Sequence, residues 1–286
     1  MKRSLSILLA LLPAMAVLAG TPAEKAAETA ALRYADSLES GRIVDLYSMM
    51  PASYQKDVVN VVRTFGATMD ADIWREVQSL VGVMADVAIA KSDLVAEMAA
   101  EESGLPASAI APDVAKAAKA AKSLVGKLSI DALKAGDVKA ILAYPEFSDI
   151  GESSKSMSKD AIAGAVVGSK TAADGSVVVT FKQKDGEPEE VPFVLVDGVW
   201  VPKEMADGWK AGVADALKDI QGLKLEAAKK QRILGMMPML KSGLESAKSA
   251  TTKEQLQQSL MMFGISAALI MGGPGGAPGQ ATGAGE

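Results

Sequence analysis

Apolar residues along most of this chain recur every three or four positions, which is the spacing of one face of an amphipathic helix. Residues 176–202 break with that spacing. Their short apolar runs are bounded by Asp174-Gly175, Asp185-Gly186 and Asp197-Gly198. Asp-Gly between apolar runs is the strongest short-range signal of a β-hairpin, because both turn residues must tolerate positive φ. We therefore predict an α+β protein: a helical N-terminal region, an antiparallel meander of three or four strands at about 161–202, and C-terminal helices.

Two-residue turns at 185–186 and 197–198 would fix the register of this meander. Thr180 would lie opposite Val191, Val178 opposite Phe193, and Leu195 opposite Trp200, all on one face. The other face would carry Val177, Val179, Phe181, Val194, Val196, Val199 and Val201. A sheet with one solvated face alternates apolar with polar residues. We therefore expect this sheet to be covered on both faces, or covered on one and hollow on the other.

Glycine and proline affect two of the predicted strands. Residues 161–171 would form the first strand, weakened or bent by Gly164 and Gly168. Pro192, which cannot donate a ladder hydrogen bond, would lie beyond the end of the short last strand, where the loss matters little.

Helix starts and stops are marked by capping residues. Thr21-Pro22-Ala23-Glu24 is a capping box with Pro at the first helical position. It opens a helix that ends at Gly41 and whose apolar face carries Ala27, Ala31, Tyr34 and Leu38. Before the strands, further helices are expected at 43–49, from Pro51 onward, and from Asp70 or Asp72 onward with a division near Ser92-Asp93. Two more regions are expected to be helical there: 112–127, with Pro112 near its start, and 129–142, as two short helices split by Gly136. After the strands, helices are expected at 204–220, at 223–249 with a break at Pro238, and at 256–271 after a capping box in 251–255.

The first 19 residues have the form of a secretory signal peptide. Lys2 and Arg3 precede an apolar run at 5–18, and Val17-Leu18-Ala19 is a small-residue cleavage motif. The run is short of the roughly 20 residues that a membrane span needs. We expect cleavage after Ala19, a periplasmic or secreted location, and no transmembrane span in the mature chain.

The remaining chain divides by composition. We expect an α+β domain at 20–220 with a helical insertion at about 51–150, followed by a C-terminal helical appendage at 221–271. Residues 272–286 are rich in Gly and Pro and should be disordered, since they lack side chains with which to build a core.

Charge and missing residue types restrict the chemistry. The 286 residues include 30 Lys and Arg against 35 Asp and Glu, a net charge of −5, and loss of Lys2 and Arg3 makes it −7. This acidic balance argues against nucleic-acid or anionic-membrane partners. There is no Cys and no His, so thiol nucleophiles, thiolate metal sites and Ser-His-Asp triads are excluded.

Several weaker motifs each have a simpler structural interpretation, which we prefer. Ser156-Met157-Ser158-Lys159 fits the S-x-x-K pattern but is better explained as a solvated loop. The acidic group Asp185, Glu187, Glu189 and Glu190 could hold Ca²⁺, but it lacks the ligand spacing of a known loop. Asp70 and Asp72 could form an acid/base pair or cap a helix. Met236, Met237, Met239, Met261, Met262 and Met271 could bind Cu(I), although methionine on helical stripes usually fills a core.

Pocket or core lining is the remaining role for the conspicuous apolar residues. These are Trp74, Tyr144, Val178, Phe193, Leu195, Trp200 and Trp209. No catalytic, cofactor-binding or metal-binding residue is assigned. The apolar stretch 260–271 is too short to span a membrane and lacks a basic face, so we expect a buried or partner-covered helix.

The ending of the meander resembles that of a known superfamily. Helices followed by Asp-Gly-punctuated strands resemble the nuclear-transport-factor-2-like (cystatin-like) proteins. Secreted bacterial members of uncertain function often end in this way, here with Phe193, Leu195, Asp197, Gly198 and Trp200. The resemblance covers 23–46 and about 161–202, and it implies a cone-shaped α+β fold. Family enzymes often use a His or Asp inside the cone. No residue here matches that role, and the helices at 51–150 and 220–271 depart from the minimal fold.

These observations rank three hypotheses. The first is a non-catalytic secreted or periplasmic binding or accessory domain, with an apolar pocket or docking surface on the sheet for an apolar small molecule or a protein partner and with no cofactor. The alternative is an envelope structural or interaction protein that acts through its C-terminal helices, with self-association through 256–271. The third is a carboxylate-based enzyme in the cone.

Overall fold

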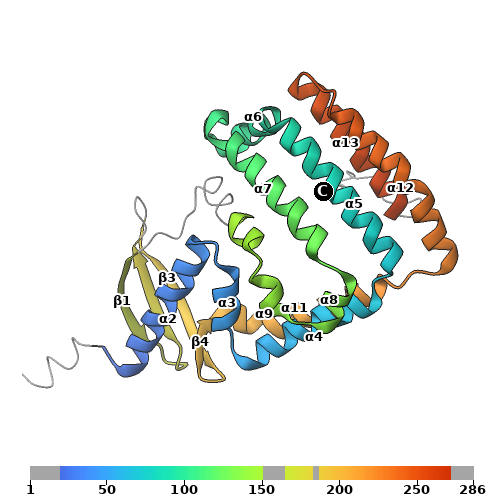
Figure 1. Ribbon diagram of the computed structural model, residues 1–286. Coiled ribbons are helices and arrows are strands. Elements are labelled where there is room, and N and C mark those ends of the chain that lie inside the picture. Colours follow the sequence, from blue (N-terminus) through green and yellow to red (C-terminus); the bar gives the residue numbers. More distant parts are fainter. Residues whose placement is uncertain (1–19, 151–164, 183–186, 272–286) are drawn as a thin grey trace, which may run out of the picture.

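A computed structural model describes residues 20–150, 165–182 and 187–271 and confirms the α+β class. Helices precede and follow a single four-stranded antiparallel sheet in the order β1-β2-β3-β4 (Figure 1). The elements are α2 (Pro22–Glu39), α3 (Ile43–Met49), α4 (Ala52–Thr68), α5 (Ala71–Ala90), α6 (Ser92–Ser103), α7 (Ala107–Lys127), α8 (Ile130–Ala135), α9 (Val138–Leu142), β1 (Ala165–Thr171), β2 (Val177–Lys182), β3 (Glu189–Val196), β4 (Val199–Pro202), α11 (Lys203–Gly222), α12 (Ala227–Ala247) and α13 (Lys253–Met271).

Capping residues start the helices where the sequence predicts. Thr21 and Glu24 form both bonds of the capping box that opens α2. The Asp70 carboxylate accepts hydrogen bonds from the first turn of α5, while Ser129 and Asp137 cap α8 and α9. Each side chain satisfies backbone N–H groups that have no partner inside the helix. These local signals place the starts of α2, α5, α8 and α9.

Two helix predictions are wrong at prolines. Helix α7 begins at Ala107, five residues before the start we expected, and Pro112 lies inside it. Helix α12 continues through Pro238 without a break. A proline inside a helix removes one backbone hydrogen bond. In α12 the neighbouring Met237 and Leu240 are buried against α5 and α13, and this packing holds the helix together across the proline.

The register between β2 and β3 differs by one residue from the prediction. Phe193 lies opposite Val177 rather than Val178, and Val191 lies opposite Val179 rather than Thr180. The last pair, Phe181 with Glu189, leaves an odd number of residues between the strands. A two-residue turn requires an even number, so the assumed turn was wrong. A one-residue slip moves side chains to the opposite face, and it brings Phe193 onto the face of Val177.

The slip places Phe193 with three other apolar strand residues under α2. Val177, Val179, Phe181 and Phe193 form one buried cluster with Ala27, Ala31 and Ala35 of the helix. This helical face differs from the predicted one, because Ala35 replaces Leu38, which is 39% exposed. Alanine lets the helix axis approach the sheet closely, whereas Leu38 would hold it away. The covered face of the sheet is therefore filled with side chains and is not hollow.

The opposite face is covered less completely. Val178, Thr180, Pro192 and Val194 are half-buried there, and Val201 is buried. Helix α11 contacts this part of the fold at β3 and β4. Pro192 lies outside the β3–β4 pairing, as expected, since β4 pairs with residues 193–196.

The turn between β3 and β4 agrees with the sequence in detail. Asp197 and Gly198 both have positive φ, and Leu195 lies opposite Trp200. The Asp197 carboxylate also accepts a hydrogen bond of 2.9 Å from the backbone N–H of Ser53 in the first turn of α4. Hydrogen bonding from the Ser53 side chain, and then from its backbone N–H, lowers the pKa of Asp197. The Asp-Gly turn therefore ties the sheet to the helical region.

Figure 1 shows the sheet and α2 on one side of the molecule and a layer of long helices on the other. In that layer α5 packs between α7 and α12, and α13 packs on α12 and touches α6. The helices of the predicted insertion and those of the predicted C-terminal appendage therefore pack against each other. Residues 1–19, 151–164, 183–186 and 272–286, which include the expected signal peptide and the disordered tail, lie outside the described residues.

Candidate functional site

An open cavity of about 300 Å³ lies beside β4, the edge strand of the sheet. Its walls come from α2, α3 and the segment after it, β4 and the first turn of α11. Most of the lining is apolar, with Trp200 as the largest side chain. The lining residues are Ala30, Arg33, Tyr34, Leu46, Ser48, Met49, Met50, Val199, Trp200, Val201, Pro202 and Met205.

Three polar side chains lie among these apolar walls. Ser48 donates a hydrogen bond of 2.7 Å to the Val44 carbonyl within its own helix. Tyr34 is half-buried, and its burial raises the pKa of the phenol. Arg33 is exposed and forms no ion pair or hydrogen bond with any described residue. A cavity with apolar walls and a few polar groups is the usual form of a small-molecule site.

A second concavity adjoins the cavity at Met205. This groove of about 360 Å³ runs between α4 and α11. Its lining is almost wholly apolar: Val58, Val61, Glu204, Met205, Gly208, Trp209, Gly212, Val213 and Ala216. Met205 lines both, so the cavity and the groove adjoin at this side chain, and we refer to the two together as the apolar path.

The C-terminal helices expose a separate apolar surface. Met239 on α12 and Met261, Met262 and Ile265 on α13 are between 45% and 61% exposed. Met239 and Met262 line a groove between the two helices together with Leu240 and Phe263. Methionine is common on surfaces that adapt to partners. This surface is distinct from the cavity at β4.

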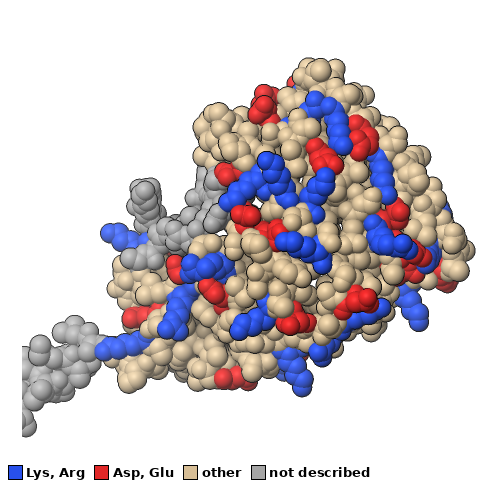
Figure 2. Space-filling model, viewed as in Figure 1, with Lys and Arg blue, Asp and Glu red and all other residues tan. Residues whose placement is uncertain are grey.

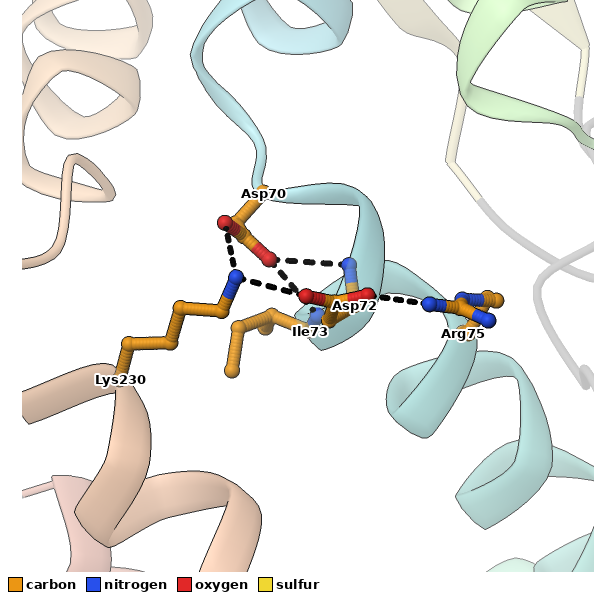
Figure 3. Close-up of polar contacts among 5 residues, drawn as sticks. All are labelled: Asp70, Asp72, Ile73, Arg75 and Lys230. Carbon is orange, nitrogen blue, oxygen red and sulfur yellow. Dashed lines mark hydrogen bonds and ion pairs between the residues drawn. The ribbon is translucent and has the colours of Figure 1, made fainter. Parts of the chain in front are cut away.

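Asp70 and Asp72 are held by a lysine from another helix (Figure 3). The Lys230 ammonium on α12 donates hydrogen bonds of 2.7 Å to both carboxylates. Asp70 also caps α5, and Asp72 pairs with Arg75. The hydrogen bonds from Lys230 lower the pKa of both aspartates. A general acid needs a pKa near the working pH, so this arrangement is suited to joining α12 to α5 rather than to proton transfer.

Glu146, unlike the partly exposed Asp70 and Asp72, is buried. Lys127 and Ser123 of α7 both donate to its Oε1 atom, and Oε2 has no hydrogen-bond partner among the described residues. The hydrogen bond from Lys127 is the main cause that lowers the pKa of Glu146 from 4.5 to about 2. Lys127 also lies over the Tyr144 ring, 5.7 Å from its centroid. Because Glu146 stays ionised well below neutral pH, it is not poised as a proton donor or acceptor.

The aromatic residues singled out from the sequence lie at separate places. Trp200 lines the cavity and packs on the core under α2. Trp209 lines the groove, stacks on Tyr54 with centroids 4.1 Å apart, and donates to Asp57. Trp74 lies edge-on to Phe65 and donates to the Leu128 carbonyl, while Tyr144 lies beneath Lys127. Only Trp200 and Trp209 therefore belong to the apolar path.

The three β2 and β3 residues predicted to line a pocket or the core also lie at different places. Phe193 is buried in the core and Val178 is half-buried on the opposite face. Leu195 is 58% exposed near the β3–β4 turn. Sequence reasoning missed Arg33, Met49 and Met205, which lie on three different helices or at their ends. Periodicity identifies the apolar face of one helix but does not show which helices meet.

The remaining motifs gain no support as sites. Ser156 to Lys159 and Asp185 lie outside the described residues. Glu190 pairs with Lys170, and the described residues contain no group of three acidic side chains that could hold a metal ion. Met237 is buried in the α12 core, whereas Met239, Met261 and Met262 are exposed. Figure 2 shows positive and negative side chains interspersed over the visible face, with no basic patch there.

Comparisons with known proteins leave the family open. No protein-family model, curated protein or solved structure matches this chain. The fold and the site define an α+β protein with an apolar cavity at a sheet edge. Across the three described ranges, no helix has both the length and the apolar character needed to cross a membrane.

Proposed function

We propose that this protein is a non-catalytic binding domain of the periplasm or the exterior of the cell, and that it binds an apolar ligand in the cavity beside β4. The observation that carries this proposal is the cavity itself, open, about 300 Å³ in volume and walled by Trp200, Met49, Met50 and Met205. Such a volume is at the lower end of small-molecule sites. The acidic net charge and the apolar walls favour an apolar ligand over nucleic acid.

Binding of the neutral fluorophore N-phenyl-1-naphthylamine tests this proposal. Ala30 lines the cavity from α2, so Ala30→Phe should obstruct it and abolish the fluorescence gain on binding. Ala214→Phe places the same side chain at an exposed position of α11 that does not line the cavity, and it should bind the probe normally. Equal binding by the two variants would contradict the proposal.

The exposed methionine surface favours a second function, an interaction protein that acts through α12 and α13. Met261, Met262 and Ile265 form an apolar surface that contact with a second copy or with a protein partner would bury. Light scattering should then find a dimer of the full chain that Met262→Lys with Ile265→Lys converts to a monomer. Gln257→Lys adds charge at an exposed position of α13 and serves as the control. A monomeric wild-type protein would leave self-association without support.

The proposed location depends on residues 1–19. Lys2, Arg3 and the apolar run that follows are typical of a signal peptide. Mass spectrometry of the protein from a periplasmic or culture-medium fraction should show a chain that begins at Gly20. An uncleaved chain confined to the cytoplasm would contradict this part of the proposal.

A further inference from the structure

Among the described residues, Arg33 is the one charged side chain that lines the cavity. The contrast with Arg42 is informative, because Arg42 lies nearby in sequence and pairs with both Asp36 and Asp45 at 2.6 Å. Arg33 has no such partner among the described residues. A guanidinium presents a planar set of donors that matches a carboxylate. An anionic group on a ligand would therefore provide the partner that Arg33 lacks.

Beyond Met205, the second concavity can accept an extended apolar ligand. The groove between α4 and α11 continues from Met205 and is lined by Val58, Val61 and Trp209. Gly212 leaves this groove open, since a Cβ atom added there would meet nothing within 4 Å. A water molecule occupies about 30 Å³ in the liquid, similar to one methylene group, so the cavity holds roughly ten such groups. A longer chain would have to enter the groove.

From these features, and resting on the proposed binding function, we infer that the ligand is a long-chain carboxylate. Its carboxylate pairs with Arg33, its proximal chain fills the cavity beside Trp200, and its distal chain passes Met205 into the α4–α11 groove. The cation gives orientation, and the apolar path gives affinity that increases with chain length. Each methylene removed from water contributes about a fourfold gain in affinity.

Calorimetry with dodecanoate and dodecanol, below their aggregation concentrations, tests the head-group contact. Arg33→Gln should weaken dodecanoate binding about tenfold or more, because a hydrogen bond to a charged group is lost. Dodecanol binding should not change. Equal loss for both ligands, or no loss for dodecanoate, would overturn the role of Arg33.

Comparison of octanoate with dodecanoate tests the chain path. Gly212→Leu should obstruct the groove and weaken dodecanoate at least fivefold while octanoate, which fits the cavity, is unaffected. Gly235→Leu is the matched control, since Gly235 is exposed on α12 and a Cβ atom there also meets nothing. Parallel losses of both carboxylates in Gly212→Leu would refute the path past Met205.

These outcomes separate the inference from the function beneath it. If the naphthylamine probe binds the wild type and not Ala30→Phe, while dodecanoate neither binds nor displaces it, the cavity is a binding site and the ligand class is wrong. If neither the probe nor dodecanoate binds, both the function and the inference fail.

Discussion

The packing of α4 on α8 leads to a sharp prediction at Gly66. This residue is buried where the two helices touch. A Cβ atom at Gly66 would lie 2.6 Å from the backbone nitrogen of Lys134 and 2.8 Å from the carbonyl carbon of Leu133. These are backbone atoms, so they cannot rotate away as the end of a side chain could. Gly66→Ala should therefore force α4 and α8 apart.

The magnitude follows from two opposing terms. Replacing glycine by alanine inside a helix gains about 1 kcal/mol of helix propensity. Overpacking costs about 1–3 kcal/mol, and contact with backbone places Gly66→Ala at about 3. We expect a net loss of about 2 kcal/mol. Gly82 in α5 is the control, because a Cβ atom there meets nothing within 4 Å and Gly82→Ala should gain about 1 kcal/mol.

Thermal unfolding followed by circular dichroism compares the two variants. For a chain of this size, each kcal/mol shifts Tm by about 2–4 °C. Gly66→Ala should melt about 4–8 °C below the wild type and Gly82→Ala about 2–4 °C above it. If Gly66→Ala is as stable as Gly82→Ala, the two helices do not approach as closely as described, and the argument fails.

Three further predictions concern the core and the buried carboxylate. Phe193→Ala should lower the free energy of unfolding by about 3–5 kcal/mol because it empties the cluster under α2. Leu195→Ala at an exposed position should cost less than about 1 kcal/mol. Urea titration compares the two variants, and similar costs would contradict the observed burial of Phe193. Trp209→Phe keeps the stack on Tyr54 but loses the hydrogen bond to Asp57, so it should lower the free energy of unfolding by about 1–2 kcal/mol in the same assay. An unchanged urea midpoint would show that this hydrogen bond contributes nothing. The pKa of Glu146 is lowered from 4.5 to about 2, so its stabilising contribution is complete above pH 4.5 and is lost as the pH falls toward 2. Glu146→Gln should therefore be less stable than the wild type at pH 7, with a difference in urea midpoint that narrows below pH 4.5, and a difference independent of pH would refute this linkage.

Local signals account for what the sequence predicted well. The turn at Asp197 and Gly198 has positive φ at two adjacent residues, and Asp-Gly is a dipeptide that adopts this conformation readily. The caps at Thr21 and Asp70 likewise depend only on side chains within one helical turn. The α+β class and most element positions follow from such local features.

The parts that could not be predicted depend on contacts between distant segments. The β2–β3 register was wrong because an Asp-Gly pair marks a turn but does not fix how many residues close it. The continuation of α12 through Pro238 depends on packing against α5, far away in the sequence. Tertiary contacts can outweigh a local preference, and no local pattern reports them.

The candidate site was predictable only in part for the same reason. Trp200 belongs to a strand whose alternation the sequence displays, and it was expected to line a pocket or the core. Arg33 lies outside the face of α2 that packs on the sheet. A charged residue at such a position is what the solvent-exposed side of any amphipathic helix carries. Its neighbours in the cavity come from α3, β4 and α11, so its setting exists only once these elements are brought together.

The position of the cavity follows from how α2 meets the sheet. Ala27, Ala31 and Ala35 let the helix lie close to β2, so the face beneath it is filled. In the part of the chain that the structure describes, β4 is the edge strand, and residues of α3 line the cavity beside it. Ala30 of α2 presents only a methyl group to this cavity, so a larger side chain there would occupy part of the space. Ala30→Phe is therefore the variant that most directly separates a binding site from a packing imperfection.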